Sequence, residues 1–163
     1  MGRNSLTFTV YIEGYSGTSW IDKWINYSGG VTCSHCTLRI ISNDNLFDYS
    51  LHVDAKQVCW VPSMYLKKLY TNKFNREFII ELGTVTNPRL EANCKRFSRL
   101  ITILWWYTSR WFINPGSTPG CLNAAMKAAK IMGINIPSVK NIDKLVEYYD
   151  CHWICRTWPS GEK

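Results

Sequence analysis

The sequence has no long hydrophobic run and no opening segment of the secretory type. Its longest mostly apolar stretch, Leu100 to Tyr107, is far shorter than the roughly 20 residues that a membrane-spanning helix needs. The first residues lead directly into an alternating pattern, without the charged start, apolar stretch and cleavage site of a leader. We therefore expect no membrane span, and synthesis in the cytoplasm without a signal peptide.

Internal repeats, low-complexity tracts and linkers rich in Ser and Gly are also missing, which argues against several domains. The chain has 163 residues, of which 46% are hydrophobic, so we expect residues 1–163 to form one globular domain. Its seven cysteines are an odd number and cannot all pair within one chain. We expect most of them to be free thiols.

Acidic residues are few relative to basic ones. Nineteen Lys and Arg against twelve Asp and Glu leave a formal charge of +7. This excess favours an anionic partner such as nucleic acid, cell-wall polymer or lipid headgroups. The basic residues are spread along the chain and no nucleic-acid motif accompanies them, so nucleic acid stays an open but less favoured partner.

Strand patterns occupy the first half of the sequence and helical patterns the second, which predicts an α+β fold. The predicted strands are Thr7–Ile12, Val31–Ile41, Phe47–Ala55 and Arg76–Leu82. The predicted helices are Trp20–Ile25 behind a Thr18 or Ser19 cap, Pro88–Tyr107, Cys121–Gly133, and Ile142–Tyr149 behind an Asn141 cap.

Cys121 follows a turn-rich loop and opens the helix predicted to end at Gly133. A thiol in the first turn of a helix faces unpaired backbone N–H groups and the positive end of the helix dipole, which favour the thiolate and lower its pKa. The same N–H groups can bind an oxyanion. Cys121 is therefore the candidate nucleophile, against the alternative of a small buried thiol at a helix end.

Three histidines are available as a base, namely His35, His52 and His152. His35 lies at the start of a predicted strand, just after the Gly29-Gly30 turn. An imidazole on a strand opposite a helix-capping thiol suits a Cys–His pair, because the imidazolium stabilises the thiolate and later protonates the leaving group. The alternative for His35 is a structural side chain with satisfied hydrogen bonds.

The order of the elements is a short helix, a glycine turn, a strand opening with Ser34-His35, two more strands and a helix opening at Cys121. This order resembles the circularly permuted papain-like cysteine hydrolases. That group includes NlpC-like cell-wall amidases and peptidases and the lecithin:retinol acyltransferase type, and similar domains occur in phage genomes. The resemblance covers residues 7–134 and leaves 137–159 as a helical C-terminal extension. It implies a small antiparallel sheet packed against the Cys121 helix.

The resemblance implies that Cys121 is the nucleophile, that His35 is the base and then the acid, and that a polar residue on the next strand orients the imidazole. Ser50, His52 and Asp54 share one face of that strand by alternation, and of these we favour His52. The implied reaction is hydrolysis of an amide or ester bond with no metal or organic cofactor. Peptidoglycan peptide is the leading substrate, and its negative charge fits a basic protein.

Two tryptophans, Trp106 and Trp111, precede the Cys121 loop, and their rings could line a substrate groove as well as pack in the core. Leu122 and Asn123 depart from the resembled pattern, in which many members carry Ser and an acidic residue after the cysteine. The first alternative is therefore a non-catalytic binding protein or phage virion component on the same fold.

A second alternative is a zinc-stabilised basic module that binds nucleic acid. Cys33 and Cys36 have the C-x2-C spacing of zinc ligands, and three more soft ligands lie near the C-terminus at Cys151, His152 and Cys155. The C-x3-C spacing of the second pair is unusual and Cys33 to Cys36 falls within a β-like run, so zinc is less favoured than the Cys–His pair.

Overall fold

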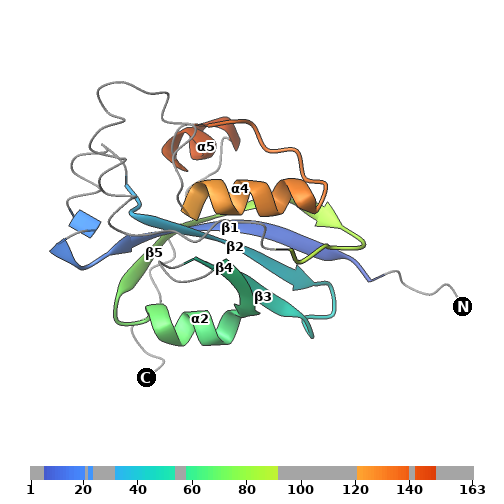
Figure 1. The fold of residues 1–163 in the computed structure, drawn as a ribbon, viewed down its shortest axis with the longest axis horizontal. Coiled ribbons are helices and arrows are strands. Elements are labelled where there is room, and N and C mark those ends of the chain that lie inside the picture. Colours follow the sequence, from blue (N-terminus) through green and yellow to red (C-terminus); the bar gives the residue numbers. More distant parts are fainter. Residues whose placement is uncertain are drawn as a thin grey trace, which may run out of the picture.

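The computed structural model describes residues 6–20, 22–23, 32–53, 58–91, 121–139 and 142–149. These residues form one five-stranded antiparallel sheet with helices on both of its faces (Figure 1), which confirms the predicted α+β content and antiparallel sheet. The strands are β1 (Phe8–Gly17), β2 (His35–Ser42), β3 (Asp48–Val53), β4 (Val58–Pro62) and β5 (Phe74–Val85). The helices are α2 (Ser63–Tyr70), α4 (Cys121–Ile131) and α5 (Ile142–Tyr149).

The strand order is β4-β3-β2-β1-β5, with β2 in the middle of the sheet. Along β1, β2 is paired over its whole length, from Ser42 back to His35. With β3, by contrast, β2 is paired only from Ile41 to Arg39, so β2 and β3 separate toward the start of β2. There the hydroxyl of Thr37 donates to the backbone carbonyl of Leu51 at 2.6 Å. The start of β2 therefore has a strand partner on the β1 side but none on the β3 side among the described residues.

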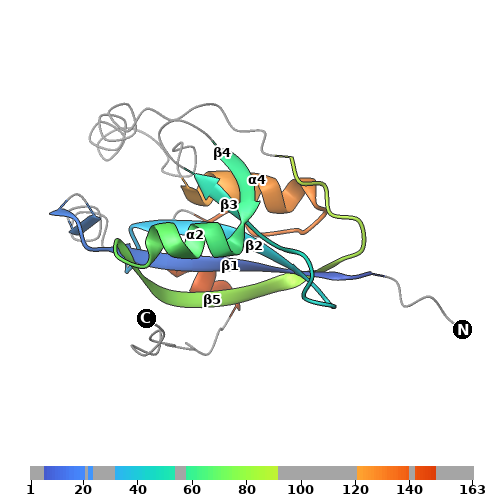
Figure 2. The ribbon, with the colours of Figure 1, turned by 90° about the horizontal axis from the view of Figure 1, so that it is seen from below.

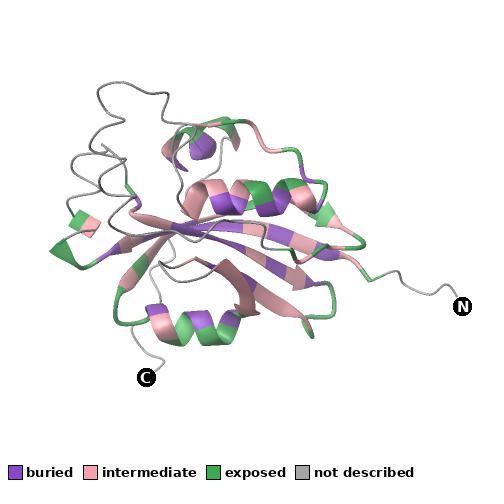
Figure 3. Cartoon of the chain, in the orientation of Figure 1, coloured by how far each residue is buried: buried purple, intermediate pink, exposed green. Residues whose placement is uncertain are grey.

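One face of the sheet packs against α4. Residues of β1 and β2 alternate between the two faces, and those on the α4 side form a buried core with the helix. The helix contributes small side chains to this contact, which lets its backbone lie close to the sheet, and its outer side is exposed (Figure 3). The principal core residues are Val10, Ile12, Leu38, Ile40, Ala124, Ala125, Ala128 and Ala129.

Helix α4 ends where the sequence predicts. Gly133 has a φ of +87°, a conformation that residues with a side chain rarely adopt. The backbone N–H of Gly133 donates to the Lys130 carbonyl and that of Ile134 to the Ala129 carbonyl, both at 3.0 Å. These two bonds form a Schellman C-cap, which satisfies carbonyl groups at the helix end.

Helix α5 extends the same core and anchors the segment before β2. Its residues Ile142, Leu145 and Val146 are buried, as the predicted apolar stripe requires. Asp143, in its first turn, accepts hydrogen bonds from the backbone N–H of Thr32 at 3.2 Å and from the Thr32 hydroxyl at 2.6 Å. The chain that leads into β2 is thereby attached to α5.

Helix α2 covers the opposite face of the sheet (Figure 2). It places Leu66 and Tyr70 against Tyr15 of β1, in a second cluster of buried residues. Beside this cluster the buried carboxylate of Glu13 accepts hydrogen bonds from Arg39 at 3.2 Å, Arg76 at 3.4 Å and the Tyr15 hydroxyl. Buried charges are stable only when paired in this way. The network fixes Tyr15, and Tyr15 in turn supports the Tyr70 end of α2.

Most predicted elements are confirmed, with shifted ends. The strand predicted from Val31 begins at His35, and the capping role of Ser19 is confirmed, since its hydroxyl accepts the backbone N–H of Asp22 at 3.2 Å. The helix predicted to begin at Pro88 is wrong for residues 88–91, which are not helical. Leu90 packs against the main core instead, so tertiary contact overrides the local pattern. The rest of that helix and the Asn141 cap lie outside the described residues.

A membrane-spanning helix was not expected from the sequence. Within the part of the chain that the structure describes, every helix is too short or too polar to cross a bilayer.

We predict that Gly14→Ala destabilises the fold. A Cβ at Gly14 would overlap the ring of Phe78 on β5 and lie 2.8 Å from Cys33 Sγ. Overpacking of this kind costs about 1–3 kcal/mol, measurable by urea denaturation. The double variant with Phe78→Leu should be more stable than the sum of the single effects by more than about 0.5 kcal/mol. Unchanged stability of Gly14→Ala would contradict the close packing described.

Candidate active site

Cys121 lies at the first position of α4, on the side of the helix that faces the sheet. It continues the stripe formed by Ala124 and Ala125, since residues three and four apart share a helix face. Its Sγ accepts a hydrogen bond from the backbone N–H of Cys36 at 3.4 Å. This N–H belongs to the part of β2 from which β3 has separated. The half-buried thiol therefore takes a place beside the sheet that a strand does not occupy.

His35 is the first residue of β2 and lies at the same end of the molecule as the start of α4 (Figure 1). Its imidazole lies close enough to Cys121 to lower the pKa of that thiol, both through its charge and as a hydrogen-bonding group. Its Nε2 atom lies 2.6 Å from the hydroxyl of Tyr70, at the end of α2. Because His35 is at the very start of its strand, the ring contacts both helices although they cover opposite faces. The structure thus brings together the two residues that the sequence singles out.

Aromatic rings hold the imidazole in place. The ring centroid of His35 is 5.4 Å from that of Phe74 and 5.5 Å from that of Tyr70. Tyr70 also contacts Tyr15 edge to face, with the centroids 5.1 Å apart. These contacts limit the rotation of the half-buried ring, so its orientation toward Cys121 is fixed by packing as well as by hydrogen bonds.

The surroundings of Cys121 favour its thiolate. A hydrogen bond from the thiol of Cys36 lowers the pKa of Cys121 most, and the charge of the His35 imidazolium, the hydrogen bond to its ring and the backbone N–H of Cys36 lower it further. Burial opposes these effects, but the pKa still lies well below the ordinary value. Cys121 is therefore the thiol in this cluster that ionises first as the pH rises.

The neighbouring cysteines have the opposite character. The pKa of Cys36 is raised well above its ordinary value by the hydrogen bond to Cys121 and by burial. Burial raises the pKa of Cys33 to about 12. Among the described residues no group of three or more candidate ligands comes together. Cys151, His152 and Cys155, the other half of the zinc hypothesis, lie outside them.

His52, the residue favoured to orient His35, is buried on β3. Ser50 is paired with Arg39 of β2, and Arg39 shares a face of the sheet with His35, four residues before it. His52 is two residues from Ser50 and therefore lies on that same face. The hydroxyl of Ser50 contacts that of Ser63 at 2.7 Å and lies four strand positions from His35. Asp54 lies outside the described residues. The orienting role of His52 stays a prediction, whereas the contact with Nε2 of His35 comes from Tyr70.

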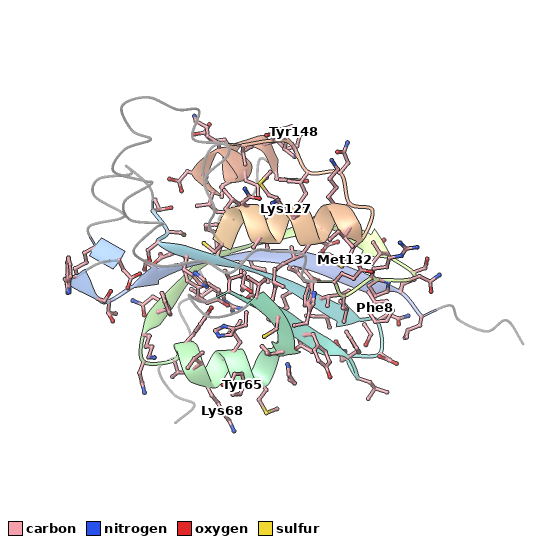
Figure 4. All side chains as sticks on the ribbon, in the orientation of Figure 1. Phe8, Tyr65, Lys68, Lys127, Met132 and Tyr148 are labelled. Atoms are coloured by element: carbon pink, nitrogen blue, oxygen red, sulfur yellow. The ribbon has the colours of Figure 1, made fainter. Side chains whose placement is uncertain are left out.

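The predicted substrate-binding residues Trp106 and Trp111 lie outside the described residues. An apolar groove is lined by Leu6, Phe8, Phe47 and residues 86–90. Phe8 is paired with Ser42, six strand positions from Cys36, which is about 20 Å at the rise of a strand. Figure 4 shows Phe8 near Met132, at the end of α4 away from Cys121. This groove is therefore not a substrate site for the thiol.

Sequence reasoning missed two contributors, Tyr70 as a partner of His35 and Cys36 as a partner of Cys121. A signal for Tyr70 exists in the spacing of Ser63, Leu66 and Tyr70, which form one buried helical face. The role of Cys36 has no local signal, because it depends on where β3 leaves β2.

Comparison with known proteins gives no relative: no protein-family model, no curated protein and no solved structure matches the chain.

We predict that iodoacetamide labels Cys121 in the native protein at pH values well below the ordinary thiol pKa of about 8.5. Its lowered pKa keeps the thiolate populated there, and labelling is lost as the pH falls through that value. Cys33, with a pKa raised to about 12, should not react in this range. Peptide mass spectrometry reads each cysteine. In His35→Ala the pH below which Cys121 is no longer labelled should rise toward the ordinary thiol pKa. The same pH dependence of labelling for Cys121 and Cys33 would disprove the prediction.

We predict that Tyr70→Phe raises the pH at which labelling of Cys121 is half lost by about one unit. When the imidazole is protonated, Nε2–H donates to the Tyr70 hydroxyl, so this bond stabilises the imidazolium and through it the thiolate. A hydrogen bond to a charged group contributes about 1.5–3 kcal/mol, and one pH unit corresponds to about 1.4 kcal/mol.

The matched control is Tyr65→Phe on the same helix, whose side chain is 56% exposed and points away from the sheet (Figure 4). It should leave the labelling profile unchanged. A Tyr70→Phe profile that coincides with that of Tyr65→Phe would show that the hydroxyl does not act on His35.

Proposed function

We propose that the protein is a cysteine hydrolase of the permuted papain-like type, which cleaves an amide or ester bond. The observation that carries the proposal is the pairing of Cys121, at the start of α4, with His35, at the start of β2. A thiolate with a lowered pKa and a hydrogen-bonded imidazole is the arrangement that nucleophilic catalysis by cysteine uses. The antiparallel sheet packed against the Cys121 helix is also what the resemblance implies.

The reaction proceeds in two steps. The thiolate of Cys121 attacks the substrate carbonyl, and backbone N–H groups at the start of α4 stabilise the oxyanion that forms. The imidazolium of His35 then donates its proton to the leaving amine or alcohol, which leaves an acyl group on Cys121. In the second step His35 takes a proton from water, the water attacks the acyl carbonyl, and the free thiolate returns. Tyr70 holds the imidazole through both steps.

The substrate class follows from charge and resemblance. An excess of seven positive charges favours an anionic polymer, and the NlpC-like enzymes that the sequence resembles act on cell-wall peptide. We therefore propose peptidoglycan peptide as the substrate. The steps above use only side chains and backbone groups of this chain, so the proposal includes no cofactor.

We predict that the protein releases peptide fragments from purified peptidoglycan, detected by mass spectrometry as new amino and carboxyl ends. Cys121→Ala should reduce the rate by about 10⁴-fold or more, because the nucleophile is lost. The control Cys59→Ala removes a cysteine of β4 and should retain the activity.

Equal release by Cys121→Ala would refute a cysteine mechanism. If the protein cleaves simple esters but leaves peptidoglycan intact, the Cys–His mechanism stands and the proposed substrate is refuted. A protein that cleaves neither, but co-sediments with peptidoglycan, would be the non-catalytic binding protein considered from the sequence.

A further inference from the structure

Two cysteines meet at the junction of β2 and α4. The backbone N–H of Cys36 donates to the sulfur of Cys121 at 3.4 Å, and the two thiols shift each other's pKa in opposite directions, Cys36 upward and Cys121 downward. Both residues are free cysteines, and Cys36 is only 2% exposed. In the proposed hydrolysis the thiol of Cys36 only supports Cys121 and does not itself react. A second sulfur so close to the first can also react with it.

The two sulfurs differ in a way that suits oxidation. Cys121 is less buried than Cys36, and its lowered pKa favours the thiolate, which is the form that reacts with peroxides. Cys36 is protonated and shielded from solvent, which protects it from direct oxidation. A thiolate next to a protected thiol is the arrangement of a peroxide-reactive cysteine with its resolving partner.

We propose that Cys121 and Cys36 form a redox pair, in which a hydroperoxide oxidises Cys121 and Cys36 then closes a disulfide between β2 and α4. Formation of this disulfide does not require the proposed hydrolysis, but the disulfide blocks Cys121 as its nucleophile until it is reduced.

The chemistry balances with the hydroperoxide as the oxidant. Cys121 Sγ attacks one peroxide oxygen, the O–O bond breaks, and the leaving hydroxide or alkoxide takes a proton from water, which leaves a sulfenic acid on Cys121. The sulfur of Cys36 then attacks Cys121 Sγ, the S–O bond breaks, and the departing hydroxide takes the proton of Cys36 and leaves as water. Two electrons pass from the two sulfurs to the peroxide. An external dithiol restores the pair by thiol–disulfide exchange.

A third cysteine in the same region provides a test of selectivity. The Cys33 sulfur lies over Gly14, beside the ring of Phe78, and it is hydrogen-bonded to the Thr32 hydroxyl at 3.9 Å. The backbone N–H of Cys36 is hydrogen-bonded to Cys121 Sγ, whereas Cys121 influences Cys33 through charge, which raises the pKa of Cys33. The disulfide should therefore join Cys121 to Cys36 and not to Cys33.

The experiment treats the reduced, desalted full-length protein with a small molar excess of hydrogen peroxide. The remaining thiols are then blocked with iodoacetamide, and the digest is mapped by mass spectrometry. We expect a cross-linked peptide pair joining Cys36 to Cys121, with the loss of two hydrogen masses, which disappears on treatment with dithiothreitol. In Cys36→Ser the cross-link should be lost, and Cys121 should instead accumulate as a sulfenic acid that dimedone traps.

Cys33→Ser is the matched control, since it removes a neighbouring buried thiol and should leave the cross-link unchanged. Wild-type protein in which Cys36 stays alkylatable while Cys121 is oxidised to the sulfinic acid would overturn the proposal, as would a cross-link from Cys121 to another cysteine. Both outcomes are measured on the wild-type protein, so they do not depend on whether a variant folds. Hydrolysis, assayed separately under dithiothreitol, can fail while the cross-link forms, so the two proposals are refuted independently.

Discussion

The hydrogen bond from the Cys36 backbone to Cys121 Sγ depends on a constraint of the sheet, the end of the β2–β3 ladder at Arg39. A continuous ladder would give the start of β2 a second strand neighbour and would leave no room for a helix terminus there. Because β3 leaves with β4, the first turn of α4 can lie against the open side of β2. The alanine stripe of α4 makes the approach close enough for sulfur to reach the backbone.

The site is built from both faces of the sheet, and His35 connects them. Cys121 comes from the α4 side and Tyr70 from the α2 side, while the imidazole stands at the end of the strand between them. Supports outside the site fix this position. Asp143 holds the chain before β2 through Thr32, and the buried Glu13 network holds Tyr15 against Tyr70. Substitutions at these supports should therefore alter the surroundings of the Cys121 thiol, although the substituted residues do not contact it.

Local signals in the sequence point to Cys121 and His35, the two residues that the structure brings close together. A turn-rich loop before an alanine-rich helix marked Cys121, and a glycine turn before a β-prone run marked His35. Their meeting depends on tertiary packing, which a single sequence does not display. The same limit explains the misplaced helix at Pro88, where core contact of Leu90 prevails. It also explains why the contact between Cys36 and Cys121 was not predicted. Tyr70 was missed because the short helix α2 was not recognised.

The wide spacing of the site residues along the chain has a consequence for biosynthesis. His35 and Tyr70 leave the ribosome well before Cys121, and the five strands precede α4 in the sequence. Contacts between distant segments form late, after the entropy of closing long loops has been overcome. Until α4 docks, Cys121 lacks both the imidazole and the β2 backbone. A nascent chain therefore carries an ordinary thiol, and the reactive one arises only with the completed fold.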